Sequence, residues 1–343
     1  MFLGLPFILL AAGCSTEEPE MPLAQVVREP QSRPTRTPPS RPVPRPQRPP
    51  PIVETPTKPS LAFRDAVAVQ TLLDRANLSC GCDDGTMGSR THTALRAWQE
   101  LNGLPPSGEL DELTLTKLGP LDRAFTTRVV TAEDHAEIAP VPRTWLGKSQ
   151  AQRLGYETIL EAVAEETHAA EDTLRALNPD ATWPNPKPGT VLTIPNPKPY
   201  PIRPASRITI SLSLKTVRVY DDHGVLLALF PCSIARDKEK RPVGELKVVN
   251  GAANPNYYFD PALFVDDEEA QTMTSRLVIP PGPNNPVGTA WISLNLSGYG
   301  IHGTPYPEDI GKTESHGCFR LANWNADKLL KMIRIGIPVA VER

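Results

Sequence analysis

The sequence predicts a multidomain protein in which a small all-α domain and an α+β domain precede a mainly-β C-terminal domain. Its 343 residues are too many for one small domain and suit two or three. Apolar residues recur at helical spacing in the first half, whereas they alternate with polar residues from Arg207 onward. The 40 prolines are unevenly spread, and a dense group of them precedes the first helical pattern.

The N-terminus carries the pattern of an export signal. Residues 1–13 are apolar and end in AAG, directly before Cys14. The run is too short to span a bilayer as a helix and is typical of a signal peptide. Its end resembles a bacterial lipobox, which implies lipidation of Cys14, and Ser15 after it implies the outer membrane. We therefore expect a cell-envelope protein, lipid-anchored on the periplasmic side of that membrane; an ordinary secretory signal with an incidental cysteine is the alternative.

Residues 14–60 complete the N-terminal region as a lipidated start and a linker rich in Pro and Arg. Between Glu29 and Ser60 almost no large apolar side chain occurs, so this segment cannot bury a core and favours extended polyproline II. At about 3.1 Å per residue, some thirty residues reach on the order of 90 Å. The segment is therefore expected to be a spacer between a membrane and the folded domains.

Residues 61–120 show the pattern of three short helices. An apolar stripe that includes Val69 and Leu73 is followed by a Gly- and Asp-containing turn, a helix with Leu95 and Trp98, and a third short helix. The segment resembles the small three-helix peptidoglycan-binding domain. The matching positions are Gln70, Asp84, Gly85, Gly88, Thr91, Ala94, Trp98, Gln99, Gly103, Leu104, Gly108 and Thr114. A helical spacer with Trp98 in its core is the alternative.

Residues 144–197 suggest a second small module. Two helical stripes, one around Ile159 and one over Thr167–Asp180, are followed by a turn and a strand over Lys187–Asn196. The segment is similar to a LysM domain, a βααβ unit that binds N-acetylglucosamine polymers. The usual opening strand is not apparent in the sequence at the start of this range.

Residues 205–343 change to a strand pattern. Alternation from Arg207 with a turn at 222–224 predicts a hairpin, and Arg241–Asn250 adds a further strand. Only Ala326–Ile335 has a convincing helical pattern, and a final strand follows it. A mainly-β, sandwich-like domain is expected.

The candidate chemistry lies in the run SHGCFRLAN, Ser315–Asn323, with a histidine shortly before it. A thiol is a good nucleophile only as the thiolate, and the imidazole of either His302 or His316 could take the proton of Cys318 near neutral pH. The backbone N–H groups of His316, Gly317 and Cys318 are consecutive and could converge on a developing oxyanion. One Cys and two His are too few and too unevenly spaced for a closed zinc site.

These residues resemble the catalytic core of the L,D-transpeptidases, the YkuD domain family of bacterial cell-wall enzymes. The matching positions are His302, Ser315, His316, Gly317, Cys318, Arg320 and Asn323, and the blocks 279–294 and 298–304 agree as well. The resemblance implies a mainly-β YkuD-type catalytic domain over residues 205–343.

The resemblance also implies a role for each residue. Cys318 would be the nucleophile and His302 the base, with its ring held by the carbonyl group of Gly303. Arg320 would bind a substrate carboxylate, and a structural ion pair is the alternative for it. Supporting roles fall to Ser315, His316 and Gly317. No metal or cofactor is implied.

The implied function is that of a peptidoglycan L,D-transpeptidase, which forms 3→3 cross-links through a cysteine acyl-enzyme. An L,D-carboxypeptidase or wall-protein-link hydrolase with the same core, and a non-catalytic membrane-to-wall anchor, remain alternatives. The expected partners are stem peptides, glycan strands and, through the lipid anchor, a membrane. The near balance of 36 Lys+Arg and 39 Asp+Glu does not point to nucleic acid. The acceptor and the pairing of Cys80, Cys82 and Cys232 stay open.

Overall fold

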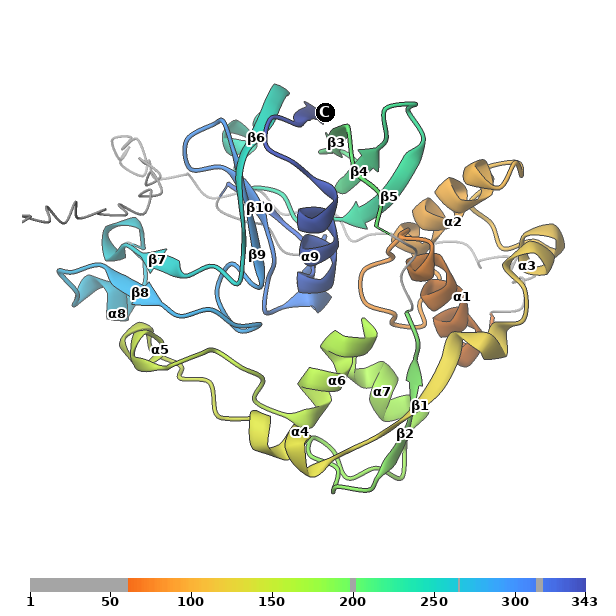
Figure 1. The fold of residues 1–343 in the computed structure, drawn as a ribbon, viewed down its shortest axis with the longest axis horizontal. Helices are drawn as coiled ribbons and strands as arrows, with labels where there is room; N and C mark the ends of the chain where they lie inside the picture. The colour runs from red at the N-terminus through yellow and green to blue at the C-terminus, as the bar shows by residue number, and fades with distance from the viewer. Residues whose placement is uncertain (1–60, 198–201, 265, 313–316) are drawn as a thin grey trace, which may run out of the picture.

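The computed structural model describes residues 61–197, 202–264, 266–312 and 317–343 (Figure 1). The predicted signal peptide, the lipidation site Cys14 and the linker up to residue 60 lie outside the described residues. Within them, no helix combines the length and the apolarity that crossing a membrane would require.

The first module consists of three helices, as predicted. They are α1 (Phe63–Arg75), α2 (Ser89–Leu101) and α3 (Glu112–Leu118). Their apolar stripes meet in a core that includes Leu73 and Trp98, and the amide of Gln99 ties α2 to the following loop and to α3. Trp98 is only 7% exposed, so it is a core residue of this module.

The middle module is built around two antiparallel strands and two helices. These are β1 (Phe125–Val129), α6 (Ile159–Thr167), α7 (Glu171–Leu177) and β2 (Val191–Pro195), and the 3₁₀ helix η1 (Leu121–Ala124) leads into β1. Leu160, Val163 and Leu192 lie in their shared core. The opening strand is therefore β1, and the module extends back beyond the expected boundary at residue 144. A sequence pattern could not show this, because β1 and β2 are separated by the whole module.

A long detour lies between β1 and α6. It contains α4 (Ala132–Glu137) and α5 (Trp145–Gln150). Thr131 and Asp134 form a reciprocal N-cap at the start of α4, which fixes where that helix begins. Figure 1 shows that the detour carries α5 away from the module to strand β8 (Leu277–Ile279) of the C-terminal domain.

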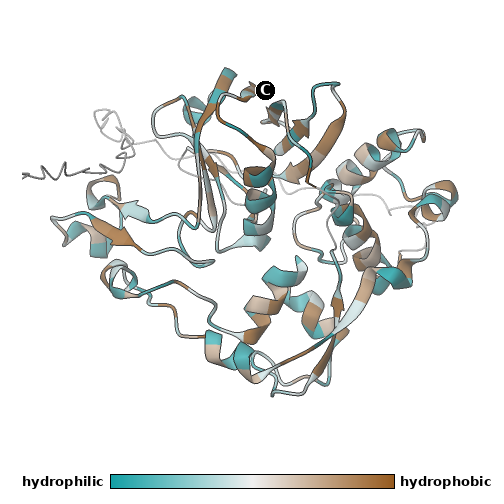
Figure 2. Ribbon diagram, viewed as in Figure 1, coloured by the Kyte–Doolittle hydropathy of each residue, from teal (hydrophilic) through white to brown (hydrophobic). Residues whose placement is uncertain are grey.

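The C-terminal domain contains one eight-stranded sheet in the order β11-β10-β9-β6-β12-β3-β4-β5. The strands are β3 (Arg207–Ser211), β4 (Thr216–Tyr220), β5 (Leu226–Pro231), β6 (Gly244–Ala253), β9 (Ala290–Leu294), β10 (Gly300–His302), β11 (Phe319–Arg320) and β12 (Pro338–Glu342). A register shift in β6 between Val248 and Asn250 marks where the sheet bends. Both halves then enclose one apolar core, with brown strands towards the interior in Figure 2. The expected sandwich-like domain is thus made from a single bent sheet.

Helix α9 (Asn323–Met332) packs against β6 and β9. It begins and ends three residues earlier than the expected helix over 326–335, because Ile333 already has extended backbone angles and ends it. The remaining elements are η2 (Lys238–Lys240), β7 (Tyr257–Phe259), η3 (Pro261–Leu263), α8 (Glu268–Gln271), β8 (Leu277–Ile279) and η4 (Pro307–Asp309).

The three modules meet at a buried ionic network to which each contributes one side chain. Asp74 of α1 accepts hydrogen bonds from His168 at 2.6 Å and from Lys328 of α9 at 3.0 Å. The His168 ring also stacks on Trp324, with ring centroids 4.8 Å apart. Burial alone would raise the pKa of Asp74, but the neighbouring Lys328 ammonium and His168 hold it well below its usual range. The contacts fix the small modules against the catalytic-domain helix.

Candidate active site

The two halves of the sequence motif meet at one edge of the sheet. Cys318 directly precedes β11, which pairs in parallel with β10, so that His302 lies opposite Arg320. The backbone N–H of Leu321 donates to the carbonyl of His302 at 2.8 Å and closes this pairing. Two short strands thereby bring the thiol and the imidazole from separate segments to the same place.

The Cys318 thiol is protonated at rest. Its sulfur donates a hydrogen bond to the carbonyl oxygen of Gly298 at 3.5 Å. Burial raises the pKa of the thiol to about 11, although the backbone N–H of Gly300 and the guanidinium of Arg320 pull it down. A desolvated thiol whose proton already has a carbonyl acceptor stays neutral until a base takes that proton.

The His302 ring is held in one tautomer. It is buried, and its Nδ1 lies 2.6 Å from the carbonyl oxygen of Gly303, the contact expected from the sequence. Because a carbonyl only accepts, Nδ1 carries the proton and Nε2 keeps its lone pair. Burial lowers the pKa of His302 to about 4, so the ring is neutral near pH 7. The Trp291 ring stacks beside it at 5.4 Å.

Asn323 and two glycines support the strand behind the histidine. A Cβ at Gly288 or Gly303 would overlap Oδ1 of Asn323. That amide accepts from the backbone N–H of Thr289 and donates to the carbonyl of Pro283, each at 3.2 Å. The missing Cβ atoms therefore let the chain turn tightly beneath the His302 ring. Asn323 belonged to the motif without an assigned role, and Gly288 was missed, although it lies in the matching block 279–294.

Two family comparisons match this chain in separate parts. Residues 205–341 match the family model described as "L,D-transpeptidase catalytic domain", and residues 64–118 match that of a "Putative peptidoglycan binding domain". Residues 205–341 form an L,D-transpeptidase catalytic domain. This domain carries the motif that resembled the cysteine-dependent acyltransferases of that family.

Individual proteins similar to this chain include two curated relatives and one solved structure. The "Putative L,D-transpeptidase YkuD" of Bacillus licheniformis is 28% identical over 53% of this chain and 92% of its own length. The "Probable L,D-transpeptidase YcfS" of Escherichia coli is 28% identical over 53% of this chain and 58% of its own length. Among solved structures, an L,D-transpeptidase from Xylanimonas cellulosilytica is 15% identical over 85% of this chain and 99% of the other, with a TM-score of 0.34.

Two tyrosines of the L,D-transpeptidase domain also border the thiol. Burial raises the pKa of Tyr257 to about 12 and that of Tyr299 above its usual value, and the negative charge of a Cys318 thiolate adds to both shifts. The Tyr299 hydroxyl donates to the carbonyl of Lys240 at 2.9 Å, and its ring faces Gly317. Sequence reasoning missed both tyrosines as site residues; only Tyr299 lay in a matching block, 298–304.

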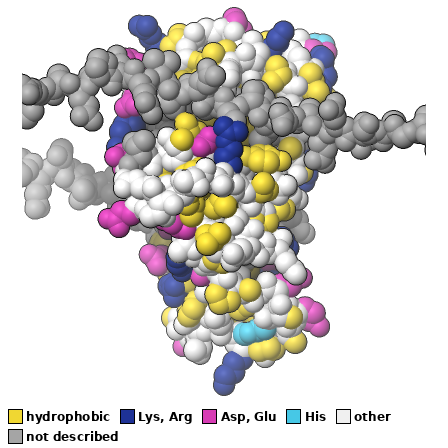
Figure 3. All heavy atoms as spheres, turned by 90° about the vertical axis from the view of Figure 1, so that its left-hand side faces the viewer, with side chains coloured by type: hydrophobic (Ala, Val, Ile, Leu, Met, Phe, Trp, Pro, Cys, Tyr) yellow, Lys and Arg dark blue, Asp and Glu magenta, His cyan; other side chains and the backbone are white. Residues whose placement is uncertain are grey.

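The β7–β8 hairpin carries Tyr257 and forms one wall of this region. Residues Tyr257–Phe259 pair with Leu277–Ile279 in an antiparallel ladder. Trp145 of α5 stacks on Phe259 with a centroid separation of 4.0 Å. Figure 3 views the side of the molecule on which this hairpin lies, with hydrophobic side chains spread over its middle among a few basic and acidic ones. The hairpin that carries Tyr257 is thus packed against a second module.

The other predicted site residues are placed as follows. Arg320 pairs with Ser233 through two backbone hydrogen bonds of 2.9 and 3.0 Å. Burial lowers the pKa of its guanidinium, while Asp309 and a Cys318 thiolate oppose that shift. Gly317 adjoins Cys318. Ser315 and His316 lie outside the described residues.

The remaining described cysteines are buried and form no disulfide with one another. They are Cys80, Cys82 and Cys232. Burial raises the pKa of each thiol, that of Cys232 to about 12. Within the described ranges, no group of His, Cys, Asp and Glu side chains is arranged to hold a metal ion.

Proposed function

We propose that this protein forms 3→3 peptidoglycan cross-links through a thioester on Cys318. The observation that carries the proposal is the His302 ring, whose Nδ1 proton is held by the Gly303 carbonyl on the strand beside Cys318. This fixes a neutral base with an available Nε2 lone pair. A base of this kind can take a proton from a buried thiol and return it to a leaving amine.

The acylation step uses these atoms in order. The Cys318 sulfur attacks the carbonyl carbon of the third residue of a tetrapeptide stem while its proton passes to Nε2 of His302. The backbone N–H groups at Gly317 and Cys318 stabilise the oxyanion. When the intermediate collapses, the C–N bond to D-alanine breaks, His302 protonates the leaving amine, and a thioester remains.

The second step transfers the acyl group. An amine of a neighbouring stem attacks the thioester carbon and gives up a proton to His302. The C–S bond breaks, the sulfur leaves as a thiolate, and His302 returns the proton to it. Arg320 is proposed to bind a carboxylate of the substrate, because its guanidinium influences the Cys318 sulfur electrostatically. If water replaces the amine, the same residues release a shortened stem.

The two N-terminal modules are proposed to hold the enzyme on its polymer. Residues 64–118 match a peptidoglycan-binding family, and the middle module has the βααβ order of a LysM domain. Binding of each module to glycan strands can be measured by pelleting the protein with insoluble peptidoglycan, using variants that alter one module at a time. The role would be contradicted if neither module contributes to pelleting.

Anchoring at Cys14 is proposed from the sequence pattern of its segment. Lipidation would place the catalytic domain in the cell envelope, with the Pro-rich segment giving it reach. Cys14→Ser should move the protein from the membrane fraction to the soluble fraction without changing its activity in solution. A wild-type protein whose mature N-terminus is not Cys14 would contradict the anchor.

The decisive experiment uses purified disaccharide-tetrapeptide and mass spectrometry. The wild-type chain should gain a thioester adduct and release D-alanine, and a 3→3 dimer should accumulate. Cys318→Ala should lower the rate by about three orders of magnitude or more, as expected for the loss of a covalent nucleophile. Release of tripeptide without dimer would identify a carboxypeptidase instead. Absence of any adduct would contradict acyl transfer.

A further inference from the structure

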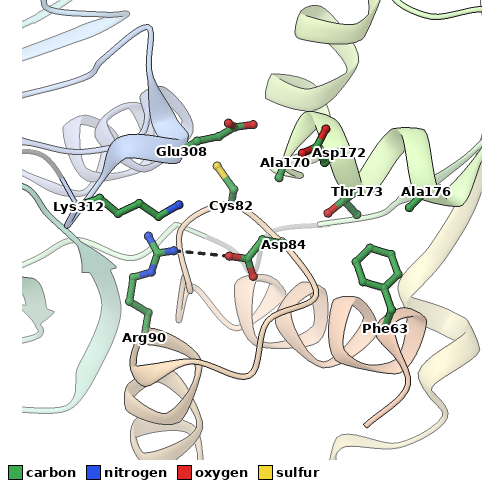
Figure 4. A pocket seen from close by; sticks show the side chains of 10 residues that line it. All are labelled: Phe63, Cys82, Asp84, Arg90, Ala170, Asp172, Thr173, Ala176, Glu308 and Lys312. Atoms are coloured by element: carbon green, nitrogen blue, oxygen red, sulfur yellow. Dashed lines mark ion pairs between the residues drawn. The ribbon is translucent and has the colours of Figure 1, made fainter. Parts of the chain in front are cut away.

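A cavity of about 410 Å³ lies where the three modules meet (Figure 4). The helical module contributes Phe63, Cys82, Asp84 and Arg90, the middle module contributes Ala170, Asp172, Thr173 and Ala176, and the catalytic domain contributes Glu308 and Lys312. None of these residues takes part in the chemistry at Cys318. The cavity is therefore a second concave site, distinct from the catalytic cleft.

Contacts between the modules give this cavity fixed walls. Asp83 and Ala169 are joined as a β-bridge, with Asp83 N–H donating to the carbonyl of His168 at 2.8 Å. The backbone N–H of Glu171 donates to the Glu308 carboxylate at 3.1 Å. These hydrogen bonds join all three modules at this point. The shape of the cavity therefore does not depend on a single flexible loop.

The basic groups of the cavity lie together. Arg90 donates to the carbonyl of Ile310 at 2.8 Å, which sets the direction of its guanidinium, and its second amino group lies 3.7 Å from Asp84. In Figure 4 the Lys312 ammonium approaches that guanidinium from the catalytic domain. Lys312 is exposed, so its charge is available to a ligand. Two cations beside the single carboxylate of Asp84 leave an excess positive charge, which suits a carboxylate.

The acidic and apolar groups complete the chemistry. Asp172 and Glu308 lie apart from the two cations in Figure 4, and the Asp172 side chain is 99% exposed. The rings and methyl groups of Phe63, Ala170 and Ala176 form the apolar part of the lining. A ligand that satisfies this arrangement carries a carboxylate, an ammonium group and a short aliphatic portion.

We propose that the cavity binds the end of a short peptide that has both a free carboxylate and a free ammonium group. Arg90 and Lys312 would receive the carboxylate, and Asp172 and Glu308 the ammonium. Stem peptides of peptidoglycan belong to this chemical class, so the identity of the ligand rests on the proposed function. The cavity would hold a stem that is not being cut.

The position of the cavity links it to catalysis. Glu308 and Lys312 both lie on the segment that joins His302 to Cys318. A peptide held between that segment and the two N-terminal modules contacts the catalytic loop and the wall-binding part of the chain together. Occupation of the cavity would therefore link Glu308 and Lys312 of the catalytic domain to the two N-terminal modules when the enzyme is on its polymer.

The test measures occupancy of the cavity by fluorescence. In a full-length Cys318→Ala chain, Phe63→Trp places a reporter in the cavity, and the Cys318→Ala parent gives the background of the five native tryptophans. Disaccharide-tetrapeptide should cause a saturable change only in the reporter chain. The same compound with amidated carboxylates should bind about tenfold more weakly, because it cannot pair with the two cations.

Further variants identify the groups that bind. Lys312→Glu should weaken binding about tenfold, and Asp172→Asn about threefold, as expected for a more exposed pair. Arg334→Glu, the same charge change on an exposed residue after α9, should leave binding unchanged. Equal effects of Lys312→Glu and Arg334→Glu, or equal binding of the amidated compound, would overturn the proposal.

The proposed function fails separately from this site. Acylation is scored by intact mass of the wild-type chain, whereas cavity binding is scored in a chain without the Cys318 thiol. An adduct without cavity binding overturns the cavity alone. Cavity binding without an adduct supports the peptide site and contradicts the transpeptidase reaction.

Lys312→Glu should also weaken the apparent affinity for polymeric substrate. The rate of acylation by a small β-lactam probe should change less, because this probe needs no second stem.

Discussion

The Cys318 thiol and the His302 imidazole both rest uncharged, and this determines how the reaction begins. Burial raises the pKa of the thiol to about 11 and lowers that of the imidazole to about 4. The proton therefore stays on sulfur in the resting enzyme rather than forming a thiolate–imidazolium pair. In the proposed mechanism, proton transfer therefore accompanies attack on the substrate, when the developing oxyanion offsets the cost of separating charge.

The first prediction concerns pH. Protonated His302 cannot accept the thiol proton, so acylation should stay constant from pH 8 down to about 5 and fall as pH approaches 4. A histidine with an ordinary pKa would lose activity from about 6.5. The fall in rate at low pH can be measured by stopped-flow across this range, with a β-lactam as the acylating compound. The ultraviolet absorbance of a thiolate should be absent at pH 7, with Cys318→Ala as the blank.

A fall in the acylation rate near pH 6.5 would show that burial does not lower the pKa of His302. Thiolate absorbance at pH 7 would show that the resting enzyme holds a preformed ion pair. Either result would mean that the burial of the two groups does not control their protonation. The pH titration and the absorbance are independent, so disagreement between them would point to a change in the rate-limiting step.

Sequence could predict those residues that share one short motif. Cys318, His302 and the ring contact to Gly303 followed from the spacing and the resemblance. Tyr257 could not be found in this way, because it comes from a hairpin whose position over the thiol depends on tertiary packing. The need for glycine at position 288 is explained only by the structure, in which a Cβ atom there would overlap Oδ1 of Asn323.

At the scale of elements, the detour in the middle module holds the hairpin beside the cleft. The backbone N–H of Trp145 donates to Glu269 at 2.7 Å, and its indole N–H donates to Asp267 at 3.0 Å. Farther along, Leu154 exchanges backbone hydrogen bonds with Pro281 and Asn284 at 3.0 and 3.1 Å. The detour therefore holds this segment at α8 and again just after β8.

The second prediction removes this contact. Trp145→Ala should destabilise the hairpin by about 1–3 kcal/mol, the usual range for losing a packed side chain that is not fully buried. Since Tyr257 lies on the same hairpin, kcat/KM should fall about tenfold, mainly through a higher KM. Trp145→Phe should restore most of the loss because it keeps the stack on Phe259.

Hydrogen exchange of β7 and β8 measures the local effect, and the melting temperature measures the global one. Leu146→Ala is the matched control, because that neighbouring side chain is 50% exposed and its contact to Glu269 uses the backbone. Unchanged exchange and unchanged KM in Trp145→Ala would mean that the hairpin holds its place without α5.

The element boundaries show what local patterns can and cannot give. The three helices of the first module were predictable, since each buries an apolar stripe formed by nearby residues. Strand β1 was not, because its five residues pair with β2 across the length of the module and only the pairing makes them a strand. Even the bend of the large sheet depends on a bulge in β6 that alternation alone does not reveal.

At the scale of the whole molecule, the modules are joined by polar groups as well as by apolar contacts. Asp74, His168 and Lys328 come from three modules and meet in the interior. Beside them, Asn325 of α9 donates to the Ser79 hydroxyl at 3.0 Å. No local pattern could predict this network, because each charged residue would be expected at the surface of its own helix. Its presence predicts that the described modules unfold together.

The third prediction tests this joint unfolding by removing one charge. Lys328→Met leaves the Asp74 carboxylate buried without its ammonium partner, and breaking a buried pair in this way typically costs about 3–5 kcal/mol. Calorimetry should show the single transition of the wild type split into two, with the catalytic domain and small modules melting separately. Adding Asp74→Asn should recover part of the loss, because no charge then remains unpaired. Lys331→Met, an exposed change on the same helix, should have no effect. A single unshifted transition in Lys328→Met would mean that apolar contacts alone join the modules.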